Sequence, residues 1–315
     1  MASLSTYFRQ VFPPSPQWSV DEISDLSGKV FIVTGGNSGV GKETCKQLLL
    51  KNAKVYLATR SESKAQAALE ELEKETGKKA LFHKLDLGDL DATKKSAKEF
   101  LEKETKLNVL IANAGVMVPP VDQLTAQKFD LQFGTNVLGH FLLIRLLYPL
   151  LVSTTTSEDP SRIVWVASAA QYLFKPPIKY EWITDTEVRG KQNPWSLYEQ
   201  SKFATVQLTY ALQMELGDKD EVAFFTLDPG NIKTDLTRHS RSLLFRVFRP
   251  LILFPVELGA LTQLYAATES SALQYKGGYL RPWARVGEPH EGTKDEAEQK
   301  KLWDYCHEAL KLWLA

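Results

Sequence analysis

From Lys29 onward, short apolar runs alternate with longer amphipathic stretches. Short apolar runs are typical of strands buried on both faces, and apolar residues spaced at i, i+3 and i+4 predict helices with one buried side. The stretches 64–76 and 93–104 show this helical spacing and have charged outer faces. Strands are predicted at 30–34, 54–58, 80–84, 108–112, 162–167, 222–227 and 278–280.

The regular alternation of strands and helices predicts one doubly wound α/β domain. We expect a mainly parallel, seven-stranded sheet with helices on both faces, because no linker divides the series. The domain is expected to span 26–291, after an N-terminal extension at 1–25 and before a C-terminal helix at 292–315 that packs on it. Two long connections, 171–195 and 231–255, follow strands, where ligands of such sheets bind, and are therefore candidate substrate loops.

Charge and cysteine content exclude several classes of protein. Lys plus Arg number 38 and Asp plus Glu number 38, so we expect no nucleic-acid partner. The two cysteines, Cys45 and Cys306, do not form the framework of a disulfide-rich secreted protein. The N-terminus lacks the pattern of a secretory signal, and together these features predict a cytoplasmic protein.

The longest apolar stretch and the histidines suggest neither an anchor nor a metal centre. The stretch 137–152 contains a histidine, an arginine and a proline and is shorter than the ~20 residues that span a bilayer, so it predicts a buried core helix. The five histidines show no metal-ligand spacing, and we expect no metal.

A glycine-rich turn joins the strand predicted at 30–34 to a helical pattern that starts at Lys42. Glycines let the backbone approach a phosphate, while the amide groups and the dipole of a helix start attract its charge. The turn therefore predicts a pyrophosphate site, although such turns also occur without a ligand. Its candidate binding residues are Gly35, Asn37, Ser38, Gly39, Val40 and Gly41.

The end of the second predicted strand indicates which nucleotide binds. NAD sites place an acidic residue here to hold the ribose 2′-hydroxyl, whereas a cation and a hydroxyl suit a 2′-phosphate. This chain has Arg60 and Ser61, and its first acid after the strand is Glu62. We therefore expect NADP(H) to be favoured over NAD(H); the alternative is that Arg60 is a solvated arginine at a helix start.

Several motifs follow one another in a recognisable order. Residues 34–41 match TGxxxGxG, residues 113–115 are Asn-Ala-Gly, and Tyr198 precedes Lys202 by four positions. Over 26–268 the chain resembles the short-chain dehydrogenase/reductase family, and within it the retinol dehydrogenase-like branch and related fungal enzymes. The resemblance implies a Rossmann fold and a catalytic tetrad of Asn136, Ser168, Tyr198 and Lys202. It also implies cofactor contacts from Asp86, Leu87, Asn113, Ala114, Gly115, Tyr198, Lys202, Pro229, Gly230, Ile232 and Thr234.

The chemistry of hydride transfer explains these residue types. Tyr198 and Lys202 share one face of a helix, where an ammonium group lowers the pKa of a phenol and makes it a better proton acceptor. Ser168 is expected to hydrogen-bond the substrate oxygen. By the resemblance, Asn136 holds a water between Lys202 and solvent, and Lys202 also binds the nicotinamide ribose.

The first candidate substrate loop is rich in rigid apolar side chains. Aromatic and proline residues beside a reactive centre form an apolar wall, which predicts a lipophilic small-molecule substrate. The residues that predict this wall are Tyr172, Phe174, Pro176, Pro177, Tyr180, Trp182 and Trp195.

The second candidate loop and the oligomeric state leave alternatives open. Arginine and apolar residues mix over 238–255, which is typical of a substrate lid, of a lid that also makes peripheral membrane contact, or of a segment that only packs on the domain. Members of the family dimerise through two long helices, which begin here near Gln127 and Ser196, but the terminal extensions could replace that homodimer interface.

These observations predict an NADP(H)-dependent oxidoreductase that interconverts a carbonyl and a secondary alcohol. Two other functions stay open. One is reduction of an activated double bond, and the other is an NADP(H)-binding sensor without turnover.

Overall fold

The computed structural model describes residues 7, 10–217, 219, 221–233 and 253–315. Eight strands form one sheet in the order β3-β2-β1-β4-β5-β6-β7-β8. The first seven run parallel, and β8 pairs antiparallel with β7 at the edge. The strands are β1 (Val30–Thr34), β2 (Lys54–Thr59), β3 (Leu81–Lys84), β4 (Val109–Ala112), β5 (Arg162–Val166), β6 (Ala223–Leu227), β7 (Tyr279–Arg281) and β8 (Arg285–Gly287).

The predicted doubly wound α/β class is confirmed, and every predicted strand is present. The prediction of seven strands missed β8. This strand has only three residues and an exposed Val286, so it forms no apolar run. β8 is held by its pairing with β7 across a tight turn, with Leu280 opposite Val286. Such pairing is a tertiary feature that hydropathy does not report.

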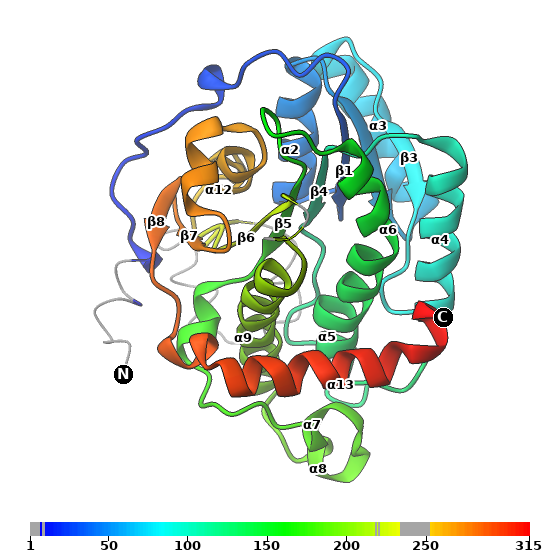
Figure 1. Cartoon of the computed structure of the whole chain (residues 1–315), viewed down its shortest axis with the longest axis vertical. Helices are drawn as coiled ribbons and strands as arrows, with labels where there is room; N and C mark the ends of the chain where they lie inside the picture. The colour runs from blue at the N-terminus through cyan, green and yellow to red at the C-terminus, as the bar shows by residue number, and fades with distance from the viewer. Residues whose placement is uncertain (1–6, 8–9, 218, 220, 234–252) are drawn as a thin grey trace.

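Helices cover both faces of the sheet and form two apolar cores (Figure 1). One core contains Cys45 and the buried residues of α2 (Gly39–Leu50), α3 (Glu62–Thr76) and α12 (Val256–Thr268). The other contains Cys306 and the buried residues of α4 (Leu90–Lys103), α6 (His140–Thr154) and α9 (Pro194–Leu212). The short helix α5 (Leu131–Phe133) lies between β4 and α6, and the short helices α7 (Glu181–Thr184) and α8 (Thr186–Gly190) lie between β5 and α9.

The apolar stretch 137–152 lies in the second core. It forms the end of a π-helical segment, Gly134–Gly139, and most of α6. Over Leu131–Thr154 the chain is long and apolar enough to cross a membrane, but 67% of that window is buried inside the protein. The Arg145 guanidinium lies 5.6 Å from the ring centroid of Trp303, so the charged residue of this stretch is covered by the C-terminal helix.

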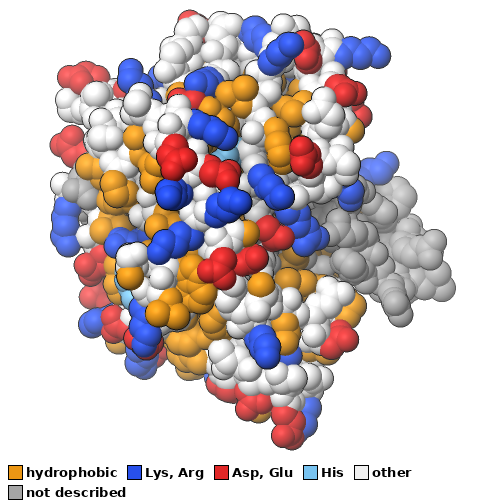
Figure 2. Space-filling model, turned by 90° about the vertical axis from the view of Figure 1, so that its right-hand side faces the viewer, with side chains coloured by type: hydrophobic (Ala, Val, Ile, Leu, Met, Phe, Trp, Pro, Cys, Tyr) orange, Lys and Arg blue, Asp and Glu red, His pale blue; other side chains and the backbone are white. Residues whose placement is uncertain are grey.

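The described segments before β1 and after β8 both pack on the sheet layers. The C-terminal helix α13 (Glu296–Leu314, red in Figure 1) runs across α9 and α6 and buries Leu302, Cys306 and Leu310. Before β1, Trp18 and Leu26 are buried in the first core. Figure 1 shows this N-terminal segment in dark blue, running beside α12 and β8. On the face in Figure 2, acidic and basic side chains are intermixed around apolar patches.

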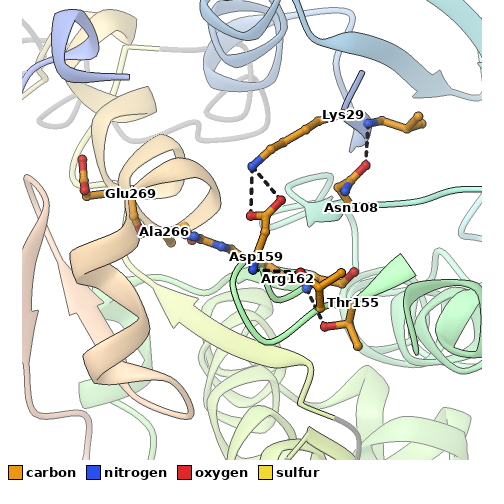
Figure 3. A network of polar contacts seen from close by, with 10 residues as sticks. Lys29, Asn108, Thr155, Asp159, Arg162, Ala266 and Glu269 are labelled. Carbon is orange, nitrogen blue, oxygen red and sulfur yellow. Dashed lines mark hydrogen bonds and ion pairs between the residues drawn. The ribbon is translucent and has the colours of Figure 1, made fainter. Parts of the chain in front are cut away.

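A buried arginine joins the sheet to the end of α12 (Figure 3). Arg162, at the start of β5, is 4% exposed, and its Nη1 donates to the carbonyl oxygens of Ala266 at 3.0 Å and Glu269 at 2.7 Å. The last carbonyls of a helix have no partner within the helix, so a guanidinium placed there satisfies them. Nearby, Lys29 and Asp159 form a partly exposed ion pair at 2.8 Å.

We expect Arg162→Met to lower the free energy of unfolding by about 2 to 4 kcal/mol, because two buried carbonyls lose their donor. Lys29→Met, which removes the neighbouring exposed cation, should change it by less than about 1 kcal/mol. Urea denaturation of both variants measures the difference. Equal losses would show that Arg162 does not hold α12.

Candidate active site

A cleft of about 760 Å³ opens at the carboxyl ends of the parallel strands. Residues from the ends of β1, β2, β4 and β5 and from the start of α2 line it, together with Tyr198 and Lys202 of α9. Parallel strands end at one edge of a sheet, so side chains that follow different strands meet there. The cleft contains all the glycine-turn residues predicted to bind pyrophosphate, and also Arg60, Ser61, Asp86, Leu87, Asn113, Ala114, Gly115, Ser168, Pro229, Gly230 and Ile232.

The glycine turn brings two stretches of backbone unusually close. A Cβ atom on Gly41 would lie 2.4 Å from the carbonyl oxygen of Gly35 and 2.6 Å from Nδ2 of Asn113. Gly35 itself has φ +69°, in the left-handed region that favours glycine. Only glycine at 41 lets α2 start against β1, so that the first amides of the helix face the cleft. This backbone arrangement fits a pyrophosphate group.

Asn113 and Ala114 hold the ends of β1 and β4 together. The Asn113 side chain donates to the carbonyl of Thr34 at 2.8 Å, and the amide of Ala114 donates to the Thr34 hydroxyl at 2.9 Å. The same hydroxyl lies 3.0 Å from Nε2 of His140. Burial lowers the pKa of His140 to about 3, so this histidine is a neutral part of the core.

Two basic side chains lie at the nucleotide end of the cleft. Arg60 is exposed there, and Ser61 caps α3 by accepting from the amide of Lys64 at 3.5 Å. Lys64 also lines the cleft, and sequence reasoning missed it because lysines are common on the outer face of a helix. Asp86, after β3, accepts from the amide of Gly88 at 3.0 Å.

Tyr198 and Lys202 lie one turn apart on α9, each 5% exposed. Nζ of Lys202 lies 5.8 Å from the centre of the Tyr198 ring and donates to the carbonyl of Val166 at 2.8 Å. Burial lowers the pKa of Lys202 to about 8, opposed by the charge of Asp228. The two side chains and Ser168 line the same cleft, as the sequence predicts.

The expected lowering of the Tyr198 pKa is not what the structure shows. Burial raises the pKa of Tyr198 above its usual value, the charge of Asp228 raises it further, and a hydrogen bond with Ser168 only partly opposes this. The four-residue spacing of Tyr198 and Lys202 indicates a nearby ammonium but carries no information on the loss of hydration. Burial and the charge of Asp228 thus favour the protonated form of the Tyr198 phenol.

Asn136 lies deeper than the other three tetrad residues. It is 1% exposed, in the π-helical turn Gly134–Gly139 that precedes α6. Its side chain accepts from the amide of Val116 at 2.8 Å and donates to the carbonyl of Val116 and the hydroxyl of Ser201, both at 3.0 Å. These contacts tie the segment after β4 to α9, and the predicted role of Asn136 in holding a water stays a prediction.

Asp228, which follows β6, is a buried acid near the site, and the sequence analysis did not predict it. Asp228 is 2% exposed; its Oδ1 accepts from the amide of Gly230 at 3.0 Å, and its Oδ2 has no hydrogen-bond partner. Burial raises its pKa to about 6, although the backbone hydrogen bonds and the charge of Lys202 oppose the shift. An acid directly before Pro229 was the available signal.

Thr234, the last predicted cofactor contact, lies outside the described residues.

Most of the predicted aromatic wall lies elsewhere. Within 171–195, only Leu173 and Trp195 line the cleft. Phe174 packs in the second core with Tyr180 and Trp182 beside it, while the buried Tyr172 is hydrogen-bonded behind the cleft. Aromatic composition could not distinguish a wall from a core.

Three described residues of the second loop line the cleft: Asn231, Ile232 and Leu253. Residues 234–252, which include most of the proposed membrane contact at 238–255, lie outside the described part of the chain.

Comparison with known proteins identifies the family. Residues 29–177 match the model of the short chain dehydrogenases. A short-chain dehydrogenase/reductase of Armillaria gallica is 43% identical over 99% of both chains, and one of Phomopsis amygdali is 34% identical over 98% of this chain and 97% of its own. The chain belongs to the short-chain dehydrogenase/reductase family. It is thus an oxidoreductase of a family that binds a nicotinamide cofactor.

Solved structures show the same fold. A protein of Mycobacterium paratuberculosis superposes with a TM-score of 0.72 at 27% identity, covering 93% of this chain and 97% of its own. An NADP complex of Pseudomonas aeruginosa RhlG has a TM-score of 0.66 at 21% identity, covering 81% and 95%. A 3-ketoacyl-(acyl-carrier-protein) reductase of Brucella melitensis complexed with NADH has a TM-score of 0.62 at 24% identity, covering 81% and 97%.

The buried acid of this dehydrogenase should make stability depend on pH. Because the pKa of Asp228 is raised on folding, the folded chain holds this proton more tightly than the unfolded chain, and stability falls as pH rises from about 4 to about 6. Asp228→Asn removes this dependence. We expect the variant to gain about 1 to 3 kcal/mol over the wild type at pH 7 and to lose that gain near pH 4, as measured by urea denaturation. A constant difference across this range would contradict the raised pKa.

Proposed function

We propose that this short-chain dehydrogenase/reductase is NADP(H)-dependent and interconverts a carbonyl and an alcohol on a lipophilic small molecule. The observation that carries the proposal is the placement of Tyr198, Ser168 and Lys202 in one cleft with the glycine turn. A bound nicotinamide would donate or accept the hydride at this end of the cleft. The side chains of the protein orient the substrate oxygen and move its proton.

Tyr198 acts as the proton donor when a carbonyl is reduced. A phenol has a pKa of about 10 in solution and burial raises that of Tyr198 further, so the side chain carries a proton that it can give to an oxygen gaining negative charge. Ser168 hydrogen-bonds with Tyr198 and lies in the same cleft, so its hydroxyl can orient the substrate oxygen. In alcohol oxidation the same groups move the proton in the opposite direction.

Lys202 stabilises the phenolate that proton donation leaves behind. Its ammonium is fixed beside the Tyr198 ring by the hydrogen bond to Val166. In a buried site with little water, a cation at this distance stabilises an anion more than it would in solvent. The charge of Asp228 keeps Lys202 protonated against the effect of burial.

The choice of NADP(H) rests on the nucleotide end of the cleft. Some solved structures of the fold carry NADP and another carries NADH, so the fold alone does not decide. Here Arg60 and Lys64 supply positive charge and Ser61 a hydroxyl. Glu71, a carboxylate of the same lining, is paired with Lys42, which lowers its pKa. This set of side chains suits a 2′-phosphate.

Tyr198→Phe should abolish most turnover and leave the cofactor bound. Loss of a general acid typically lowers kcat by ~10²- to 10⁴-fold, while the ring that packs in the cleft is kept. NADPH consumption with a panel of lipophilic ketones measures kcat, and fluorescence titration measures the NADPH Kd. Tyr210→Phe is the matched control, since Tyr210 lies on the same helix and does not line the cleft.

Residual activity above a tenth of the wild type in Tyr198→Phe would refute the role of the phenol. If NADPH binds to the wild-type protein but no ketone or aldehyde is consumed, the sensor hypothesis is favoured instead.

Arg60→Asp should reverse the preference between nucleotides. A charged hydrogen bond contributes ~1.5 to 3 kcal/mol, so its loss should weaken NADPH binding by ~10- to 150-fold, while an acid at this position favours the ribose hydroxyls of NADH. Titration with both cofactors measures the ratio of their Kd values. Lys98→Asp is a control of equal charge change on the exposed face of α4. An unchanged ratio in Arg60→Asp would show that Arg60 is only a solvated side chain.

A further inference from the structure

Residues far from the tetrad in sequence complete the reactive end of the cleft. Tyr7 and Val11, which precede the sheet, line the same cavity as Ser168 and Tyr198. Tyr7 packs on a small apolar cluster that includes Ala169, the residue after Ser168. A segment that sequence analysis treats as a lead-in thus lies beside the reacting groups.

A buried glutamine fixes this segment in place. Gln10 is 1% exposed, its Nε2 donates to the Tyr172 hydroxyl at 2.6 Å, and its Oε1 accepts from the Tyr279 hydroxyl at 3.1 Å. The Tyr172 hydroxyl in turn donates to the carbonyl of Glu288. The two tyrosine rings meet edge to face, with centroids 6.2 Å apart. A buried amide with both ends satisfied holds one position, because every shift would leave a polar group without a partner.

Gln10 therefore determines where its neighbours point. Val11 directly follows Gln10, so fixing Gln10 also fixes its neighbour. Tyr7 and Val11 both line the cleft, while Gln10 is hydrogen-bonded to Tyr172 and Tyr279. Burial raises the pKa of the Tyr7 hydroxyl, and the charges of Asp228 and Glu199 raise it further.

The other described residues at this end are mainly apolar. Leu173 and Trp195 come from the first substrate loop and Leu253 from the end of the second. Val116 and Met117 follow β4. Within the described lining of this end, Lys202 is the one charged side chain, and it is already bonded to the backbone. Apolar groups of a substrate fit the described part of this lining, because they lose no hydration when they pack against such side chains.

We propose that Tyr7 and Val11 are specificity-determining residues of the substrate site, held in place by Gln10 as a positioning residue. They limit the size of an apolar substrate next to its reacting carbonyl or alcohol. This proposal rests on the proposed oxidoreductase function, because it assigns the wall of that same site.

The test changes the size of the wall and compares substrates of two sizes. Tyr7→Ala and Val11→Ala enlarge the site, and Val11→Phe reduces it. The measured quantity is the ratio of kcat/KM for a two-ring ketone to that for a one-ring ketone, with NADPH. We expect at least a tenfold rise of the ratio in Tyr7→Ala, a smaller rise in Val11→Ala and at least a tenfold fall in Val11→Phe.

Gln10→Ala tests the positioning role. It should raise KM for the two-ring ketone several-fold more than it lowers kcat, because the proton donor and cofactor are untouched while the wall is no longer fixed. Phe12→Ala is the control, since Phe12 is adjacent, 53% exposed and does not line the cleft. Ratios unchanged within twofold in all three wall variants, with NADPH affinity and melting temperature kept, would overturn the proposal.

A second readout separates this proposal from the proposed function. Nile red, an uncharged apolar dye, can accept energy from bound NADPH when it lies close to the nicotinamide. We expect Val11→Phe to weaken this transfer at least fivefold while Phe12→Ala leaves it unchanged. If the wild type consumes no ketone but this pattern holds, the proposed oxidoreductase function is refuted, while the assignment of Tyr7 and Val11 to the wall of the site is supported. If ketones are consumed but Val11→Phe changes neither the kcat/KM ratio nor the energy transfer to Nile red, only the assignment of Tyr7 and Val11 is refuted.

Discussion

The parallel pairing of β1, β4, β5 and β6 is the constraint on which the site depends. Because these strands run the same way, the residues that follow them meet at one edge of the sheet: Gly35 after β1, Asn113 after β4, Ser168 after β5 and Asp228 after β6. Close approach then restricts the residue types, most clearly at Gly41, where any side chain would collide with the Gly35 carbonyl. The cofactor site is thus mainly a consequence of strand direction and backbone contact.

Burial determines the direction of the pKa shifts at the site. Tyr198, Lys202 and Asp228 are all almost inaccessible to water, and burial shifts the pKa of each toward its uncharged form. Asp228 and Lys202 oppose this shift in one another because their charges are opposite. Burial thus favours the protonated phenol of Tyr198, while the charge of Asp228 favours the charged form of Lys202. Both are the forms that carbonyl reduction needs under the proposed mechanism.

The N-terminal segment changes how the substrate end is understood. Composition pointed to the aromatic loop as the wall, yet Phe174, Tyr180 and Trp182 pack with the core around α9 and α13. Tyr172 does not line the cleft, and its hydroxyl instead accepts a hydrogen bond from Gln10. Residues that precede the sheet take the place that the loop was expected to fill. Unlike the glycine turn, this part of the site depends on contacts between segments 162 positions apart.

The sequence by itself determined the α/β class, seven of the eight strands, the glycine turn and the meeting of Tyr198 and Lys202 in one cleft, while the catalytic roles of the tetrad stay a prediction. These features follow from local patterns, since strand hydropathy, glycine in a turn and the four-residue spacing of Tyr198 and Lys202 act over a few positions. Tertiary structure alone decided the direction of the Tyr198 pKa, the charge of Asp228 near Lys202, the presence of Lys64 in the cleft, the edge strand β8 and the wall at Tyr7 and Val11. The reason is that hydration, charge and contact depend on which distant segments fold against each residue, and no local pattern carries that information.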